Sequence, residues 1–114
     1  MITSWQEAIS EIERLIAEKV RDFSAETTKN TEDFLAFASG RLLPPNEVGE
    51  GYWATISAHW TEAKPAPIEV EIHDDHYEFY RFFDGRTDIK HFEHLPGQPL
   101  PEPLIALLTE WPLR

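Results

Sequence analysis

The sequence contains no cysteine. Disulfide bonds, thiol nucleophiles and thiolate metal sites are therefore excluded, and the absence agrees with a cytoplasmic protein. The chain also has no long apolar run, and its first residues have neither the basic nor the apolar segment of a signal peptide. We therefore expect no membrane span and a cytoplasmic location.

Positive charge is scarce in this chain. It has 10 Lys and Arg residues against 21 Asp and Glu residues, which gives a formal net charge of −11. Such a chain is repelled by nucleic-acid phosphates and by anionic membrane surfaces, so we expect neither as a partner. The charge serves solubility, and it also favours a basic protein as the partner.

Recognisable catalytic motifs are missing as well. The chain has no serine in a nucleophile elbow and no glycine-rich phosphate loop. The segment Gly49–Gly51 is too short for a dinucleotide fingerprint and follows a proline-containing loop instead of a strand. We therefore assign no catalytic residue and no cofactor.

The apolar content is that of a folded protein. Of the 114 residues, 41% are hydrophobic and 12% are aromatic, which suffices for an ordinary core without a structural metal. We expect a single α+β domain over residues 1–114.

Helical spacing of apolar residues appears in three places. Residues 4–23 form one apolar stripe behind a capping box at Ser4, which predicts a long first helix. Ser24–Asn30 is polar and aperiodic and predicts a loop. Glu32–Ser39 predicts a short second helix capped by the preceding Asn or Thr, and residues 104–111 predict a final one before Pro112.

Strand patterns occupy the middle of the chain. Arg41–Gly51 has two prolines and two glycines and predicts a loop. Tyr52–Trp60 alternates between the two faces of a half-buried strand. Three further strands follow between Ile68 and His94, with turns at Asp74-Asp75 and at Asp84-Gly85.

The Asp84-Gly85 turn sets the register of the last two strands. Asp-Gly is typical of a type I′ hairpin, in which both central residues have positive φ. The pairing then joins Arg81 to Asp88, an opposite-charge pair, and Tyr80 to Ile89.

These elements follow in the order α-α-β-β-β-β-α. Short connections between sequential strands predict a two-layer sandwich, in which a four-stranded antiparallel meander packs on the long N-terminal helix. That helix is expected to cover the sheet face of Val70, Phe79 and Phe92.

The opposite face of the sheet is the predicted functional surface. Tyr80, Phe82 and Ile89 would form an apolar centre there, surrounded by an acidic rim of Glu69, Glu71, Glu78 and Glu93. This composition is typical of a protein interface. It favours a small acidic, non-enzymatic interaction domain of the inhibitor, immunity or adaptor type, which binds a protein partner or a second copy of the chain as a dimer.

The alternative is a small-ligand-binding or metal-dependent enzyme on the same sheet. His76 and His91 share the predicted face with two carboxylates and could approach a metal ion, although their spacing matches no known ligand pattern. We therefore expect no metal. A deep pocket that brings either histidine or His59 against a carboxylate would favour the enzyme, and its aromatic lining would come from Trp53, Trp60, Tyr80 and Phe82.

Overall fold

The computed structural model of the protein describes residues 1–18 and 22–110. Within them, three helices and a five-stranded antiparallel sheet confirm the α+β class. No helix in these two segments is long and apolar enough to cross a membrane. The elements are α1 (Trp5–Glu18), α2 (Ala25–Ala38), β1 (Glu47–Glu50), β2 (Ile56–Trp60), β3 (Ile68–Ile72), β4 (His76–Phe83), β5 (Arg86–Glu93) and α3 (Glu102–Glu110).

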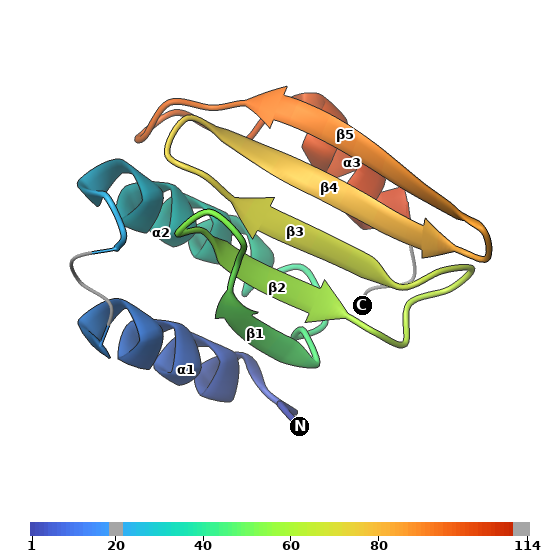
Figure 1. Cartoon of the computed structure of the whole chain (residues 1–114), viewed down its shortest axis with the longest axis horizontal. Coiled ribbons are helices and arrows are strands. Elements are labelled where there is room, and N and C mark those ends of the chain that lie inside the picture. Colours follow the sequence, from blue (N-terminus) through green and yellow to red (C-terminus); the bar gives the residue numbers. More distant parts are fainter. Residues whose placement is uncertain (19–21, 111–114) are drawn as a thin grey trace.

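The five strands lie side by side in chain order, and the helices lie on one side of the sheet (Figure 1). We call the helix side the inner face and the opposite side the outer face. The prediction that the N-terminal helix covers the centre of the sheet is wrong. α1 contacts β1 at the edge, whereas α2 contacts β3, because the sheet has one strand more than expected and α1 packs along that strand.

The additional strand is β1, which lies within the segment Arg41–Gly51 that was predicted to be a loop. It pairs with β2 from Glu47 opposite His59 to Glu50 opposite Ile56. Two glutamates and a glycine in four residues give this segment little intrinsic strand preference. Pairing with β2 therefore supplies the stability that composition does not, and the meander has five strands instead of four.

The start of α2 also differs from the prediction. Ser24–Asn30 was expected to be a loop, yet Ser24 is the N-cap of α2 and its hydroxyl accepts a hydrogen bond from the Thr27 backbone N–H at 3.0 Å. Thr27, Asn30 and Thr31 lie on the buried side of the helix. Because polar residues occupy core-facing positions, this part of the helix has no helical spacing of apolar residues that the sequence could reveal.

Replacement of Ser24 by alanine is expected to lower the free energy of unfolding by about 1 kcal/mol, because the first turn of α2 loses its capping acceptor. Urea unfolding followed by circular dichroism measures the change. Ser39→Ala is the matched control, since its cap interaction uses the backbone N–H and survives the substitution. An equal loss in both variants would contradict the capping role.

The ends of the other two helices are shorter or shifted. α1 was predicted to reach residue 23, but Phe23 lies in a bend because Ser24 must be extended to cap α2. Val20, a member of the predicted stripe, lies outside the described residues. α3 begins at Glu102 and buries Leu104 and Leu108, while the predicted end at Trp111 and Pro112 also lies outside the described residues.

The core lies between the inner face and the helices. Phe34 of α2 is at its centre, with ring centroids 6.5 Å from Trp60 and 6.0 Å from Tyr77. Beside it, the fully buried Asn30 donates from Nδ2 to the His73 carbonyl at 3.0 Å, and its Oδ1 lies 3.0 Å from Nδ1 of His94. One polar side chain therefore ties α2 to the β3–β4 turn and to the end of β5.

The β4–β5 register agrees with the prediction at every pair, including Tyr80 with Ile89 and Arg81 with Asp88. The turn type does not agree. Gly85 has a φ of 71°, but among the described residues Ala54 is the single non-glycine with positive φ, so Asp84 does not meet the type I′ requirement. At the free edge of the sheet, Lys90 of β5 stands opposite the buried Phe79, in an inner-face row.

Candidate functional site

The outer face holds the seven residues predicted to form the binding surface. Side chains on a strand alternate between the two faces, so strand pairing arranges these residues in cross-strand rows. The rows are Glu69–Tyr80–Ile89, then Glu71–Glu78–His91, then His76–Glu93, with Phe82 next to Tyr80 on the same face of β4.

The apolar centre of this face is open to solvent. The rings of Tyr80 and Phe82 are almost parallel, with centroids 6.0 Å apart. Phe82 is 39% exposed and Ile89 is 60% exposed. The described helices all lie on the inner face (Figure 1), so none of them covers these side chains.

Two carboxylates face each other across β3 and β4 beside this centre. Glu71 is paired with Glu78 and is only 5% exposed. The Tyr80 hydroxyl lies 3.0 Å from Oε1 of Glu71 and 2.5 Å from Oε1 of Glu78, but its single proton can serve one of them at a time. Burial and the two carboxylates raise the pKa of Tyr80. The pair therefore has more acceptors than donors, although Thr55 donates to Oε2 of Glu71.

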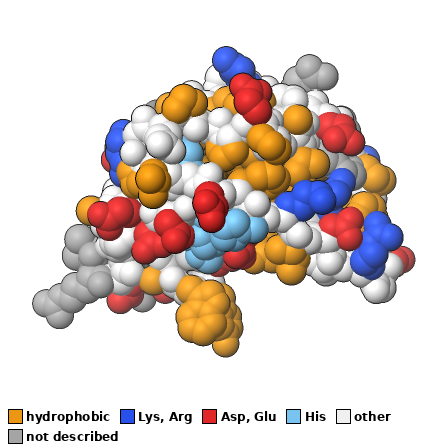
Figure 2. All heavy atoms as spheres, turned by 90° about the horizontal axis from the view of Figure 1, so that it is seen from above, with side chains coloured by type: hydrophobic (Ala, Val, Ile, Leu, Met, Phe, Trp, Pro, Cys, Tyr) orange, Lys and Arg blue, Asp and Glu red, His pale blue; other side chains and the backbone are white. Residues whose placement is uncertain are grey.

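Three histidines stack next to these carboxylates. The His76 ring lies 3.9 Å from the ring of His73 and 4.0 Å from that of His91. Its Nδ1 is 2.6 Å from Oδ1 of Asp75, and its Nε2 is 3.1 Å from Oε2 of Glu78. Figure 2 shows histidine and acidic side chains together on the surface.

The carboxylates at this stack are stabilised in their charged form. The hydrogen bond with His76 lowers the pKa of Asp75. Partial burial opposes the ionisation of Glu78, but hydrogen bonds with Tyr80 and His76 outweigh it, so the pKa of Glu78 lies below its ordinary value. Both groups carry negative charge at neutral pH and attract cations.

The remaining two histidines lie apart from the stack. His94 is buried on the inner side, where Nε2 is 2.7 Å from the Gln98 carbonyl, and it serves the core. Nδ1 of His59 lies 3.8 Å from Oε1 of Glu69 on the outer face. The structure therefore separates His94 and His59 from the three stacked histidines.

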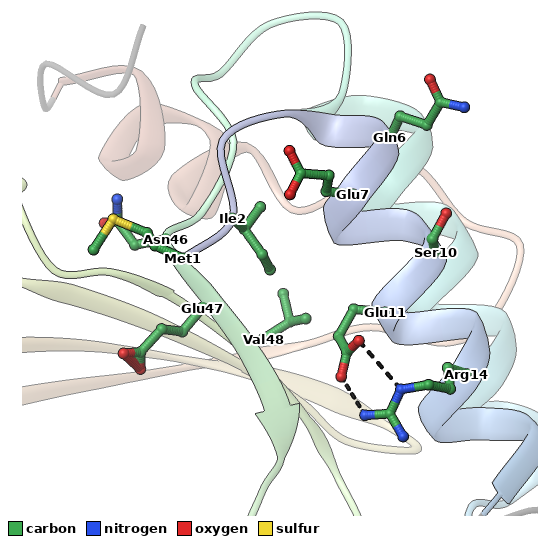
Figure 3. Close-up of a pocket in the computed structure, with 10 residues that line it drawn as sticks. All are labelled: Met1, Ile2, Gln6, Glu7, Ser10, Glu11, Arg14, Asn46, Glu47 and Val48. Carbon is green, nitrogen blue, oxygen red and sulfur yellow. Dashed lines mark hydrogen bonds and ion pairs between the residues drawn. The ribbon is translucent and has the colours of Figure 1, made fainter.

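The four aromatic residues that were expected to line a pocket do not come together. Trp60 is buried on the inner face, whereas Tyr80 and Phe82 lie on the outer face and Trp53 is 72% exposed. A shallow groove of about 770 Å³ lies between α1 and β1. Figure 3 shows it lined by Glu7, by the Glu11–Arg14 ion pair and by an apolar floor, without a histidine.

Sequence reasoning missed an exposed aromatic pair at the β1–β2 turn. Tyr52 and Trp53 were predicted to be strand residues, but they lie in the turn and are 83% and 72% exposed. The centroids of their rings are 4.7 Å apart. The turn depends on Ala54, whose φ is 56°, a conformation that alanine rarely adopts and that its sequence does not signal.

This turn lies against the outer face. A Cβ on Gly51 would lie 2.6 Å from Oε2 of Glu71, so the backbone runs directly over that carboxylate. Trp53 and His73 line the same small hollow of about 160 Å³. Figure 2 shows hydrophobic side chains projecting from the surface beside the histidines. The outer face thus has aromatic groups at two places, with carboxylates and histidines between them.

Comparison with known proteins adds no relationship to this description. No protein-family model matches the chain, and neither a curated protein sequence nor a solved structure is significantly similar to it. The residues of the outer face are therefore the basis for assigning a function.

Proposed function

We propose that the protein is a non-enzymatic interaction domain that binds a basic protein partner through its outer sheet face. The observation that carries the proposal is the solvent-exposed apolar cluster of Tyr80, Phe82 and Ile89, which is surrounded by glutamate side chains on the same face. Exposed aromatic residues surrounded by polar groups are typical of the energetic centre of an interface. An inhibitor, immunity or adaptor role fits a chain that binds without carrying out a reaction.

The charge of the face favours one class of partner. Glu69, Glu71, Glu78 and Glu93 all lie on it, and the whole chain has a net charge of −11. A basic surface would be drawn to this face and would offset its charges on contact. A second copy of the chain would bring like charges together, so pairing through this face is disfavoured relative to a basic partner.

The exposed pair Tyr52 and Trp53 supplies a second contact. Tyr and Trp bury much area for few rotatable bonds and are enriched at the centres of interfaces. Because Gly51 runs over Glu71, the pair stands at the border of the acidic face. A partner that contacts both this aromatic pair and Ile89 would cover the carboxylates that lie between the two contacts.

Phe82→Glu is expected to weaken partner binding at least about tenfold, which corresponds to about 1.4 kcal/mol, and to leave the fold intact. Phe82 is already 39% exposed, so its replacement disturbs the core little. The partner is first identified by affinity capture from the native host and mass spectrometry, then purified and titrated calorimetrically against both proteins. Circular dichroism verifies the fold of the variant.

Leu43→Glu is the matched control, because Leu43 is 49% exposed, lies outside the sheet and gains the same charge. It is expected to bind like wild type. Raising NaCl from about 50 to about 300 mM is expected to slow association, as screening weakens attraction between opposite charges. Equal binding by Phe82→Glu and wild type would refute the proposal. A wild-type dimer that Phe82→Glu dissociates would replace the basic partner by a second copy.

A further inference from the structure

We propose that His73, His76 and Glu78 form a binding site for a divalent transition-metal ion of the zinc class. The site lies on the outer face next to the proposed protein-binding surface, and its existence does not depend on that function. It replaces the pair His76 and His91 considered from sequence, because His91 stacks on the outside of His76 and is exposed.

The ligand-type atoms of these three residues are already close together. Each residue offers one nitrogen or oxygen atom, and these atoms all lie within 4.8 Å of one another. Tetrahedral zinc with bonds of about 2.1 Å holds its ligand atoms about 3.4 Å apart. Nε2 of His76 and Oε2 of Glu78 are 3.1 Å apart, so this pair needs little movement and His73 needs a side-chain rotation.

Hydrogen bonds hold the backbone of these three residues in place. His76 and Glu78 are two positions apart on β4 and point to the same face. His73 comes directly after β3 and begins the tight turn into β4. Its backbone N–H donates to the His76 carbonyl at 3.0 Å. Asn30 holds the His73 carbonyl from the core side. The turn is therefore fixed from both sides, and ligation requires rotation of side chains only.

Asp75 prepares His76 as a ligand. Its Oδ1 lies 2.6 Å from Nδ1 of His76, and a carboxylate in this position is the usual orienting partner of a metal-binding histidine. With the proton on Nδ1, Nε2 presents a lone pair toward Oε2 of Glu78, which is also an acceptor. An Nε2 proton that bonds to Glu78 and a metal ion occupy the same place between these two atoms. A metal ion can therefore take the place of that proton and bridge the imidazole and the carboxylate.

His73 provides an independent observation. Its Nε2 is buried and has no hydrogen-bond partner among the described residues. The nearest oxygens are Oε1 of Glu71 at 3.4 Å and Oε1 of Glu78 at 3.6 Å. A buried nitrogen without a hydrogen bond is unfavourable, and a metal ion beside Glu78 would coordinate it. The two carboxylates would balance the positive charge.

Calorimetric titration of ZnCl₂ into the full chain, cleared of metal with EDTA, tests the site. The expected result is saturable one-to-one binding with a Kd of about 10 μM or lower. His76→Gln and Glu78→Gln are each expected to weaken binding at least about tenfold, because each removes one of three ligands. His59→Gln is the matched control, since it removes a histidine of the same face that lies outside the cluster, and it is expected to bind like wild type.

Substitution of Co²⁺ for zinc gives a second readout, because tetrahedral nitrogen and oxygen ligation produces strong visible absorption that both ligand variants should lose. Circular dichroism verifies that the variants are folded. The absence of saturable zinc binding below about 100 μM in wild type would overturn the inference. So would unchanged binding in both folded ligand variants. Partner binding, measured separately with Phe82→Glu, would be unaffected by either result.

Discussion

Asn30→Ala is expected to lower the free energy of unfolding by about 3 kcal/mol, because two buried polar groups lose their partner. Asn30 is fully buried, and its side chain contacts the His73 carbonyl and Nδ1 of His94. Alanine would leave both groups in the core without water. The Tyr77 hydroxyl keeps its hydrogen bond, since it donates to the backbone carbonyl of residue 30.

Urea unfolding of wild type and variant measures this change. Lys29→Ala, at the neighbouring position of α2, is the control, because it removes only the ion pairs of an exposed lysine with Glu32 and Asp33. It is expected to change stability by less than about 0.5 kcal/mol. A loss below about 1 kcal/mol in Asn30→Ala would mean that water replaces the amide and that the contact is not essential. Faster hydrogen exchange at the His73 amide should accompany the predicted loss.

Gly51→Ala is expected to destabilise the protein by about 2 kcal/mol and to displace the β1–β2 turn. The added Cβ would overlap Oγ1 of Thr55 and lie 2.6 Å from Oε2 of Glu71. The clash breaks the hydrogen bond from Thr55 to Glu71 or moves the turn that carries Trp53. If Trp53 contacts the partner, affinity falls together with stability.

Gly49→Ala is the control for this substitution. Gly49 lies two residues earlier in β1, and a Cβ there meets no atom within 4 Å. Thermal unfolding of both variants separates the steric effect from the general effect of replacing a glycine. A loss of similar size in both would show that the close approach over Glu71 is unimportant.

The β4–β5 hairpin could be predicted because its signals are local. Asp-Gly marks the turn, and alternation on both sides assigns each side chain to a face. From these two rules it follows that Tyr80, Phe82 and Ile89 share one face of the sheet. The turn conformation at Asp84 did not follow, since the dipeptide does not determine φ by itself.

The parts that sequence did not reveal depend on distant contacts. Asn30 is polar, and its burial is favourable because the His73 carbonyl and Nδ1 of His94 are its partners. Glu47–Glu50 becomes a strand because β2 is available to pair with it. These two features leave no period or motif in the chain. His73 and His76 flank the predicted turn at Asp74-Asp75, but the stacking of their rings depends on side-chain rotamers that the turn residues do not encode.

The position of Lys90 has a consequence for assembly. β5 is a sheet edge, where unpaired backbone groups could recruit a strand from another molecule and begin a fibril. Lys90 stands in the inner-face row beside Phe79, so a strand added at β5 would partly remove its side chain from water. That penalty discourages growth along the hydrogen-bonding direction, and a partner that approaches face-on meets no such obstacle.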